Sequence, residues 1–179
     1  MVIAGALVLE PTMLVADEPV ASLDASVRGE ILALLLRLRG ELGLAALVVT
    51  HDPGLAWNIA DRLAVMYLGR IVEVGTPEEV FASPRHPPVP PVVLTGEAPD
   101  ATRIPAGCRF HPRCPELASG EAAEAGVAAS CTGVPLPVLP AALPSGAGMV
   151  SCHLAAATAG DDPAASAAVP AAPLIPTEP

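Results

Sequence analysis

The chain has 179 residues, a length that predicts one domain and a tail. Its 19 acidic residues outnumber its 9 basic residues, and the net charge of −10 argues against nucleic acid or an anionic membrane as a direct partner, because both bind clustered Lys and Arg. Every basic residue is an arginine, so the phosphate-binding motif G-x-x-x-x-G-K-[ST], which needs a lysine, is absent from this sequence.

Residues 13–16 and 44–49 are short, wholly apolar runs, a pattern typical of buried parallel strands. Between them, apolar residues recur at helical spacing over residues 27–42. Gly43 follows where a helix C-cap is expected. The order strand, helix, strand predicts a βαβ unit with a right-handed crossover. Residues 1–83 therefore indicate an α/β fold.

Polar residues follow both predicted strands. Asp17 and Glu18 come after the first strand, and His51 comes after the second. Because parallel strands end at the same edge of a sheet, where such sheets bind ligands, we expect these side chains to meet there. An aspartate can hold Mg²⁺, usually through water, the glutamate can polarise a water, and the histidine can bind a phosphate. This set predicts part of a site that hydrolyses a nucleoside triphosphate.

The next elements are a short helix over about residues 55–61 and a hairpin of strands 63–67 and 71–74 that turns at Gly69. The sequence Thr-Pro-Glu-Glu at residues 76–79 is a capping box that opens a short helix. No apolar run reaches the roughly 18 residues of a membrane span, and no signal peptide is indicated, so we expect a cytosolic protein.

Three segments of different composition follow. Residues 84–107 are a Pro-rich linker, residues 108–153 contain four cysteines with little periodicity, and residues 154–179 are rich in Ala and Pro and predict a disordered tail. The cysteine spacings, C-x5-C, x16 and x20, differ from the C-x2-C of zinc fingers, so a metal site and free structural thiols both stay open. His111 and His153 flank cysteines and are interpreted as spacers. The cysteines are Cys108, Cys114, Cys131 and Cys152.

Three motifs in the first half resemble the nucleotide-binding subunits of ABC transporters. Residues 14–18 match the Walker B strand, Ser22-Leu23-Asp24 the D-loop and His51 the switch histidine. The resemblance implies a partial P-loop-type nucleotide-binding domain, a parallel sheet with flanking helices, that uses ATP and Mg²⁺. It further implies that Asp17 binds the Mg²⁺ of MgATP, that Glu18 is the catalytic base and that His51 contacts the γ-phosphate. The D-loop residues would communicate across a head-to-tail dimer.

The family's Walker A loop, Q-loop and signature motif have no counterpart in this sequence, and residues 1–7 look like the helix that follows the signature. We therefore expect a subunit truncated before Walker B and inactive alone. The absent half of the sheet would leave a strand edge and an apolar face uncovered.

The cysteine segment resembles the C-terminal extension of the oligopeptide/dipeptide importer subgroup of ABC ATPases. The similar stretches are PAGCRFHPRCP at residues 105–115 and Ser-Cys-His at residues 151–153. This resemblance implies import of oligopeptides, dipeptides or nickel-type chelates. It also implies a second ABC ATPase subunit and permease subunits as partners, at the inner face of the cell membrane.

Some members of the subgroup hold a [4Fe-4S] cluster, and the resemblance implies such a cluster on the four cysteines of this chain. A zinc ion and the absence of any metal remain open as alternatives. Two alternatives to a transport ATPase follow. One is a non-catalytic module that binds iron–sulfur or zinc and docks a transporter, and the other is a gene fragment without function.

Overall fold

The structure is a computed structural model that describes residues 2–21, 23–82, 99–137, 140–142 and 148–159. The chain divides into two compact units, Met1–Ala60 and Asp61–Pro179. The predicted hairpin falls in the second unit. Among the described helices, none combines the length and the apolar character that a membrane crossing requires.

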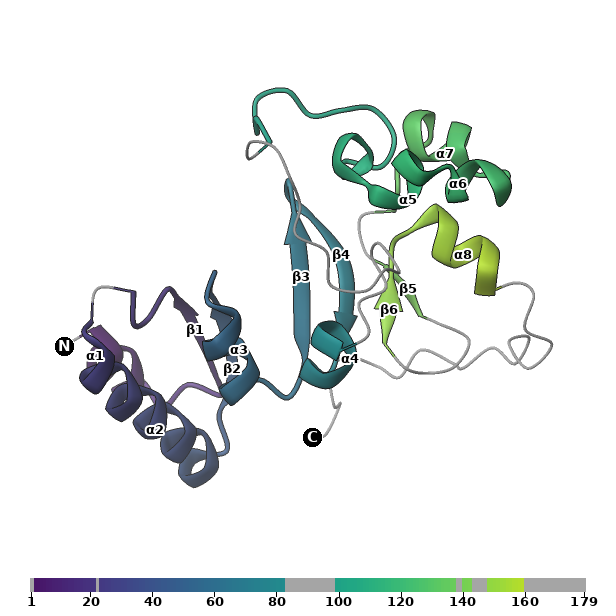
Figure 1. Cartoon of the computed structure of the whole chain (residues 1–179). Coiled ribbons are helices and arrows are strands. Elements are labelled where there is room, and N and C mark those ends of the chain that lie inside the picture. The colour runs from purple at the N-terminus through teal and green to yellow at the C-terminus, as the bar shows by residue number, and fades with distance from the viewer. Residues whose placement is uncertain (1, 22, 83–98, 138–139, 143–147, 160–179) are drawn as a thin grey trace. The chain divides into compact units, whose positions relative to one another are not determined.

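Unit 1 is built on the predicted βαβ motif (Figure 1). Strands β1 (Met13–Asp17) and β2 (Ala45–Val49) pair in parallel, with Met13 opposite Ala45 and Asp17 opposite Val49. The helix between them, α2, spans Ala25–Leu42 and ends at Gly43, whose φ of 64° is the left-handed C-cap expected from the sequence. The flanking helices are α1 (Val2–Leu7) and α3 (Pro53–Ile59).

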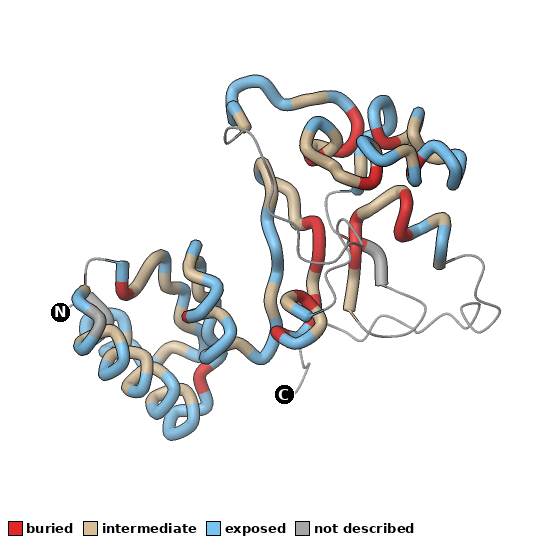
Figure 2. Tube along the Cα trace, in the orientation of Figure 1, coloured by how far each residue is buried: buried red, intermediate tan, exposed pale blue. Residues whose placement is uncertain are grey.

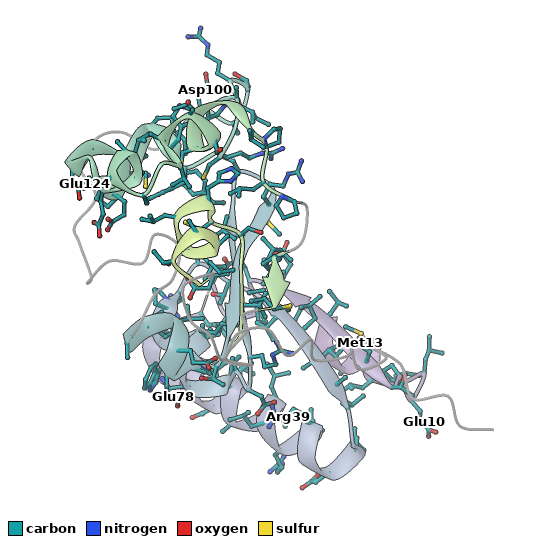
Figure 3. The ribbon with its side chains drawn as sticks, turned by 90° about the vertical axis from the view of Figure 1, so that its right-hand side faces the viewer. Glu10, Met13, Arg39, Glu78, Asp100 and Glu124 are labelled. Atoms are coloured by element: carbon teal, nitrogen blue, oxygen red, sulfur yellow. The ribbon has the colours of Figure 1, made fainter. Side chains whose placement is uncertain are left out.

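One face of the β1–β2 sheet is exposed. Met13, Val15, Leu47 and Val49 each keep half or more of their surface accessible (Figure 2; Met13 is labelled in Figure 3). Parallel sheets are normally covered on both faces, and in the described part of unit 1 this face has no cover. An uncovered apolar face of this sheet is what the sequence predicts.

Unit 2 contains a four-stranded antiparallel sheet in the order β3-β4-β6-β5. The predicted hairpin forms its first half, with a turn at Leu68 and Gly69, both at positive φ. The second half was not predicted from the sequence, because two-residue strands carry no alternation that can be recognised. The strands are β3 (Leu63–Tyr67), β4 (Arg70–Gly75), β5 (Ala141–Ala142) and β6 (Met149–Val150).

Short helices complete unit 2. The capping box opens α4 as expected: the Thr76 N–H donates to Glu79 Oε2 (2.8 Å) and the Glu79 N–H donates to Thr76 Oγ1 (3.3 Å). These helices are α4 (Pro77–Ala82), η1 (His111–Arg113), α5 (Pro115–Ser119), α6 (Glu121–Glu124), α7 (Ala128–Gly133) and α8 (His153–Ala159).

The core of unit 2 joins segments that are distant in the sequence. Phe110 is buried, and its ring meets the ring of Tyr67 edge-on, with the ring centroids 5.1 Å apart. Leu154 and Ala155 of α8 are also buried. Their burial explains why residues 154–159 are helical although their composition predicts disorder. The rest of the predicted tail and most of the predicted linker lie outside the described residues.

Candidate functional site

Glu18 lies one residue beyond β1, in a conformation that brings it to the end of β2. Its N–H donates to the Val49 carbonyl oxygen (2.9 Å), and its φ is 45°. A positive φ is uncommon for a residue with a side chain and costs on the order of 1–3 kcal/mol. Such strain is found most often at functional sites, where surrounding contacts hold it.

The carboxylate of Glu18 binds both the backbone and the ring of His51. Its Oε1 accepts a hydrogen bond from the His51 N–H (2.9 Å) and lies 2.6 Å from His51 Nδ1. Its other oxygen, Oε2, lies 3.5 Å from the Thr50 hydroxyl. The expectation that these two side chains meet at the carboxyl ends of adjacent parallel strands is confirmed.

This contact favours the charged form of both side chains. The hydrogen bond from His51 lowers the pKa of Glu18, and the hydrogen bond to Glu18, followed by its negative charge, raises the pKa of His51. The pair therefore favours a carboxylate beside an imidazolium. The His51 side chain is 84% exposed, so solvent screens the pair and leaves the ring accessible to a ligand.

The other predicted site residues are less constrained. Asp17 is the last residue of β1 and is exposed, and within the described part of the chain its carboxylate makes no hydrogen bond or ion pair. Asp24 is the N-cap residue of α2, without a side-chain cap bond. The Leu23 carbonyl accepts a hydrogen bond from Arg28 Nε (2.7 Å). Ser22 lies outside the described residues.

A positioning group that the sequence reasoning did not single out lies next to His51. Asp52 caps α3, since its Oδ1 accepts from the N–H groups of Gly54 (2.9 Å) and Leu55 (3.1 Å). The Asp52 N–H in turn donates to Thr50 Oγ1 (3.1 Å). An aspartate directly before a proline at the start of a helix could have revealed this cap. The cap fixes the backbone that directly follows His51.

The second candidate site is a small cavity of about 20 Å³ in unit 2 that all four cysteines line. They come from separate segments: Cys108 precedes η1, Cys114 precedes α5, Cys131 lies in α7 and Cys152 precedes α8. His111 and His153 also line the cavity. Each of these rings has one nitrogen within hydrogen-bonding distance of a backbone carbonyl, at Cys108 (3.0 Å) and Val134 (2.9 Å).

A close approach of two backbone segments helps to form this cavity. The Cys108 N–H donates to the Cys131 carbonyl oxygen (2.9 Å). The preceding residue, Gly107, has a φ of 67°, and a Cβ atom there would lie 2.5 Å from the same oxygen. Only glycine fits this position, because both the conformation and the contact exclude a side chain.

The thiols are in an environment that disfavours the thiolate. Burial raises the pKa of Cys108 to about 11, and burial also raises the pKa values of Cys131 and Cys152. Burial and the neighbouring Glu121 raise the pKa of Glu116, on the cavity wall, to about 7. All four cysteines are free thiols. Among the described residues, no group of three or more Cys, His, Asp or Glu side chains has the arrangement of a metal site.

The comparisons with known proteins agree with both sets of motifs. Residues 91–120 match the family model described as the Oligopeptide/dipeptide transporter, C-terminal region. The Dipeptide transport ATP-binding protein DppF of Haemophilus influenzae is 42% identical over 128 residues, which are 63% of this chain and 39% of that protein. The Oligopeptide transport ATP-binding protein OppF of Salmonella typhimurium is 39% identical over 140 residues, 68% of this chain and 42% of that protein.

A solved structure of cbiO1 from Clostridium perfringens, part of the ABC transporter complex cbiONQ, is 44% identical in sequence. The match covers 45% of this chain and 32% of that chain, with a TM-score of 0.43. The chain spans about two fifths of the length of the two ATP-binding relatives. Over that part, the resemblance to the ATP-binding subunits of oligopeptide and dipeptide ABC transporters is confirmed.

Proposed function

We propose that this chain is the C-terminal part of an ATP-binding and ATP-hydrolysing subunit of an ABC importer for oligopeptides, dipeptides or nickel-type chelates. The observation that carries the proposal is the Glu18–His51 hydrogen bond at the carboxyl ends of β1 and β2. The names of the two ATP-binding relatives support the transport of peptides. The chain contains no G-x-x-x-x-G-K-[ST] motif, so phosphate binding would depend on a segment outside this sequence.

Each residue has a proposed role in hydrolysis. Glu18 is the general base: its Oε1 accepts hydrogen bonds from His51, and Oε2, which lies 3.5 Å from the Thr50 hydroxyl, accepts a proton from the attacking water. His51 donates to the γ-phosphate, and its raised pKa favours the protonated ring that does so. Both side chains emerge where the two strands end, so base and phosphate contact lie side by side.

Asp17 and the D-loop complete the proposed site. The Asp17 carboxylate is exposed and has no partner among the described residues, so it fits a role toward Mg²⁺ through water. When bound, the Mg²⁺ would neutralise charge on the phosphates. Ser22, Leu23 and Asp24 are proposed to face a second ABC ATPase subunit, and permease subunits would hold the assembly at the cytoplasmic face of the membrane.

The four-cysteine cavity supports a second proposal, an iron–sulfur or zinc site on Cys108, Cys114, Cys131 and Cys152. Four soft thiol donors from separate segments converge on one buried cavity, which is the donor set that both groups prefer. The Arg113 Nε atom, next to Cys114 in sequence, is buried and has no hydrogen-bond partner among the described residues. A cationic group of this kind would favour a net negative charge at the cysteines.

The catalytic proposal is tested by joining this chain to the N-terminal part of a relative such as DppF of Haemophilus influenzae and measuring ATP hydrolysis. We expect turnover in the joined protein and a loss of about 10²–10⁴-fold in Glu18→Gln, with ATP binding retained. Glu30→Gln, on the exposed surface of α2, is the matched control and should leave turnover unchanged. Undiminished turnover in Glu18→Gln would remove Glu18 as the base.

The metal proposal is tested by analysing iron, sulfide and zinc in protein purified without oxygen. We expect bound metal that is lost when Cys108 and Cys131, the two buried cysteines, are replaced by serine. A metal-free wild-type protein that also fails to bind added zinc or to accept a reconstituted cluster would show that the thiols are structural.

A further inference from the structure

Unit 2 contains a second cavity, separate from the four-cysteine cavity, with a volume of about 200 Å³. It lies against β4 and is bounded by the segments around residues 104–109 and 135–137. Most of its wall is apolar and is formed by side chains such as Ile71, Ile104 and Leu136 together with prolines. None of the residues proposed for ATP hydrolysis or for metal binding lines this cavity.

The charge of the cavity wall is opposite to that of the chain. Arg70 and Arg109 line the cavity, and among the described residues no acidic side chain does, although acidic residues outnumber basic ones about two to one in the sequence. Arg109 donates one N–H to the Leu68 carbonyl and retains further donors, because a guanidinium carries five. In the described part of the chain, neither arginine forms an ion pair with a carboxylate.

A buried hydroxyl also lines the cavity. Ser151 follows β6 and is 3% exposed, and its N–H donates to the Val72 carbonyl (2.8 Å), which fixes it beside β4. Its Oγ atom has no hydrogen-bond partner among the described residues. A buried polar atom is normally satisfied, and an unpaired one next to a cavity indicates a group that enters the cavity.

We propose that this cavity binds a small free carboxylate with an apolar body, of about the size of an N-acylated amino acid. The carboxylate would accept hydrogen bonds from the two arginines, the apolar body would cover the proline and aliphatic wall, and the Ser151 hydroxyl would gain its missing partner. An apolar cavity of about 150 Å³ holds a benzene molecule, so about 200 Å³ accommodates the carboxylate and the apolar side chain of such a ligand, with the acyl group at the opening. An inorganic anion would leave the apolar wall uncovered, and a neutral apolar molecule would leave both guanidinium groups without a counter-charge.

The experiment uses the full chain as purified and follows binding of N-acetyl-L-leucine by isothermal titration calorimetry and ligand-observed NMR. We expect a dissociation constant of about 1 mM or tighter. The matched probe N-acetyl-L-leucinamide has the same apolar body without the charge. It should bind at least about tenfold more weakly, because hydrogen bonds to an ionised group are the stronger ones.

Two variants locate the binding in this cavity. Arg70→Gln should weaken binding of the carboxylate by about five- to tenfold, and Ser151→Ala by about threefold or more. Arg62→Gln, an exposed arginine that does not line the cavity, is the control and should leave the affinity unchanged. Circular dichroism checks that each variant is folded.

Three results would overturn the proposal. The first is wild-type protein that is folded and does not bind the carboxylate. The second is equal binding of the acid and the amide. The third is binding that a folded Arg70→Gln protein retains in full. Ser151→Leu, which fills the cavity with an apolar side chain, gives an independent check, because it should abolish binding without removing either arginine.

Discussion

The two units of this chain differ in how well they are packed and in how readily their chemistry can be recognised. In unit 1 the buried apolar side chains are Val20, Leu44 and Leu55, among the described residues, while an apolar face of its sheet is exposed. Unit 2 contains most of the buried residues, as Figure 2 shows. Yet the strand-end pair of Glu18 and His51 lies in unit 1, whereas the family-model match to residues 91–120 lies in unit 2.

The difference shows that a contact between two side chains can form although the sheet that carries them has an exposed apolar face. The Glu18–His51 contact needs only the parallel pairing of β1 and β2 and the turns after them. The four-cysteine cavity needs α7, α8 and the segment around η1 to pack together. The first site therefore depends on local geometry, and the second depends on the stability of the whole unit.

The largest expected effect is a difference in hydrogen exchange between the units. Amides of β1 and β2 should exchange at least about a hundredfold faster than amides of β4, because a two-stranded sheet with one bare face opens at little cost in free energy. Mass-spectrometric exchange on the full chain measures this. Equal protection of β1 and β4 would contradict the difference in packing, since it would show that the apolar face of the β1–β2 sheet is covered in solution.

Gly107→Ala tests how tightly the segments of unit 2 are packed against each other. The added Cβ meets the Cys131 carbonyl oxygen at 2.5 Å in a left-handed conformation, so we expect a loss of about 3 kcal/mol in the free energy of unfolding. Urea unfolding followed by circular dichroism measures it. Gly133→Ala, where a Cβ would meet nothing within 4 Å, is the control and should be neutral or slightly stabilising. Similar costs for both would show that the close approach at Gly107 is relaxed in solution.

Thr76→Ala removes half of the capping box at the start of α4. We expect a cost of about 1 kcal/mol in the unfolding of unit 2, because the hydroxyl satisfies the Glu79 N–H. Glu78→Ala changes an exposed residue in the same turn (Figure 3) and should cost less than half as much. Urea titrations of the two variants give the comparison, and equal costs would mean that the cap bond contributes nothing of its own.

The smallest effect in free energy concerns the Glu18–His51 pair, since both groups are reached by solvent. Glu18→Gln should lower the pKa of His51 toward its ordinary value of 6.5. NMR titration of the His51 ring in the two proteins measures this. An unchanged His51 titration would show that the pair does not form in solution.

The same pair makes a small contribution to stability that depends on pH. Because the folded pKa of His51 is raised, its contribution is fully present below pH 6.5 and is lost as the pH rises through the folded value. Because the folded pKa of Glu18 is lowered, its contribution is present above pH 4.5 and is lost as the pH falls through the folded value. The pair is therefore expected to stabilise unit 1 most between these two ordinary values.

The sequence by itself determined the features that depend on short-range patterns. Helix α2 follows from apolar residues at helical spacing, its end follows from Gly43, and the capping box follows from Thr76 and Glu79. The meeting of Glu18 and His51 also follows, because parallel strands end at one edge whatever else the sheet contains.

Only the tertiary structure decided the features that depend on packing between distant segments. The pairing of β6 with β4 and the burial of Ser151 beside β4 join residues that share no period. The left-handed backbone of Glu18 is likewise held by a bond to Val49 on the next strand. Periodicity records how a segment meets its own neighbours in the chain, and it contains no information on which remote segment covers it.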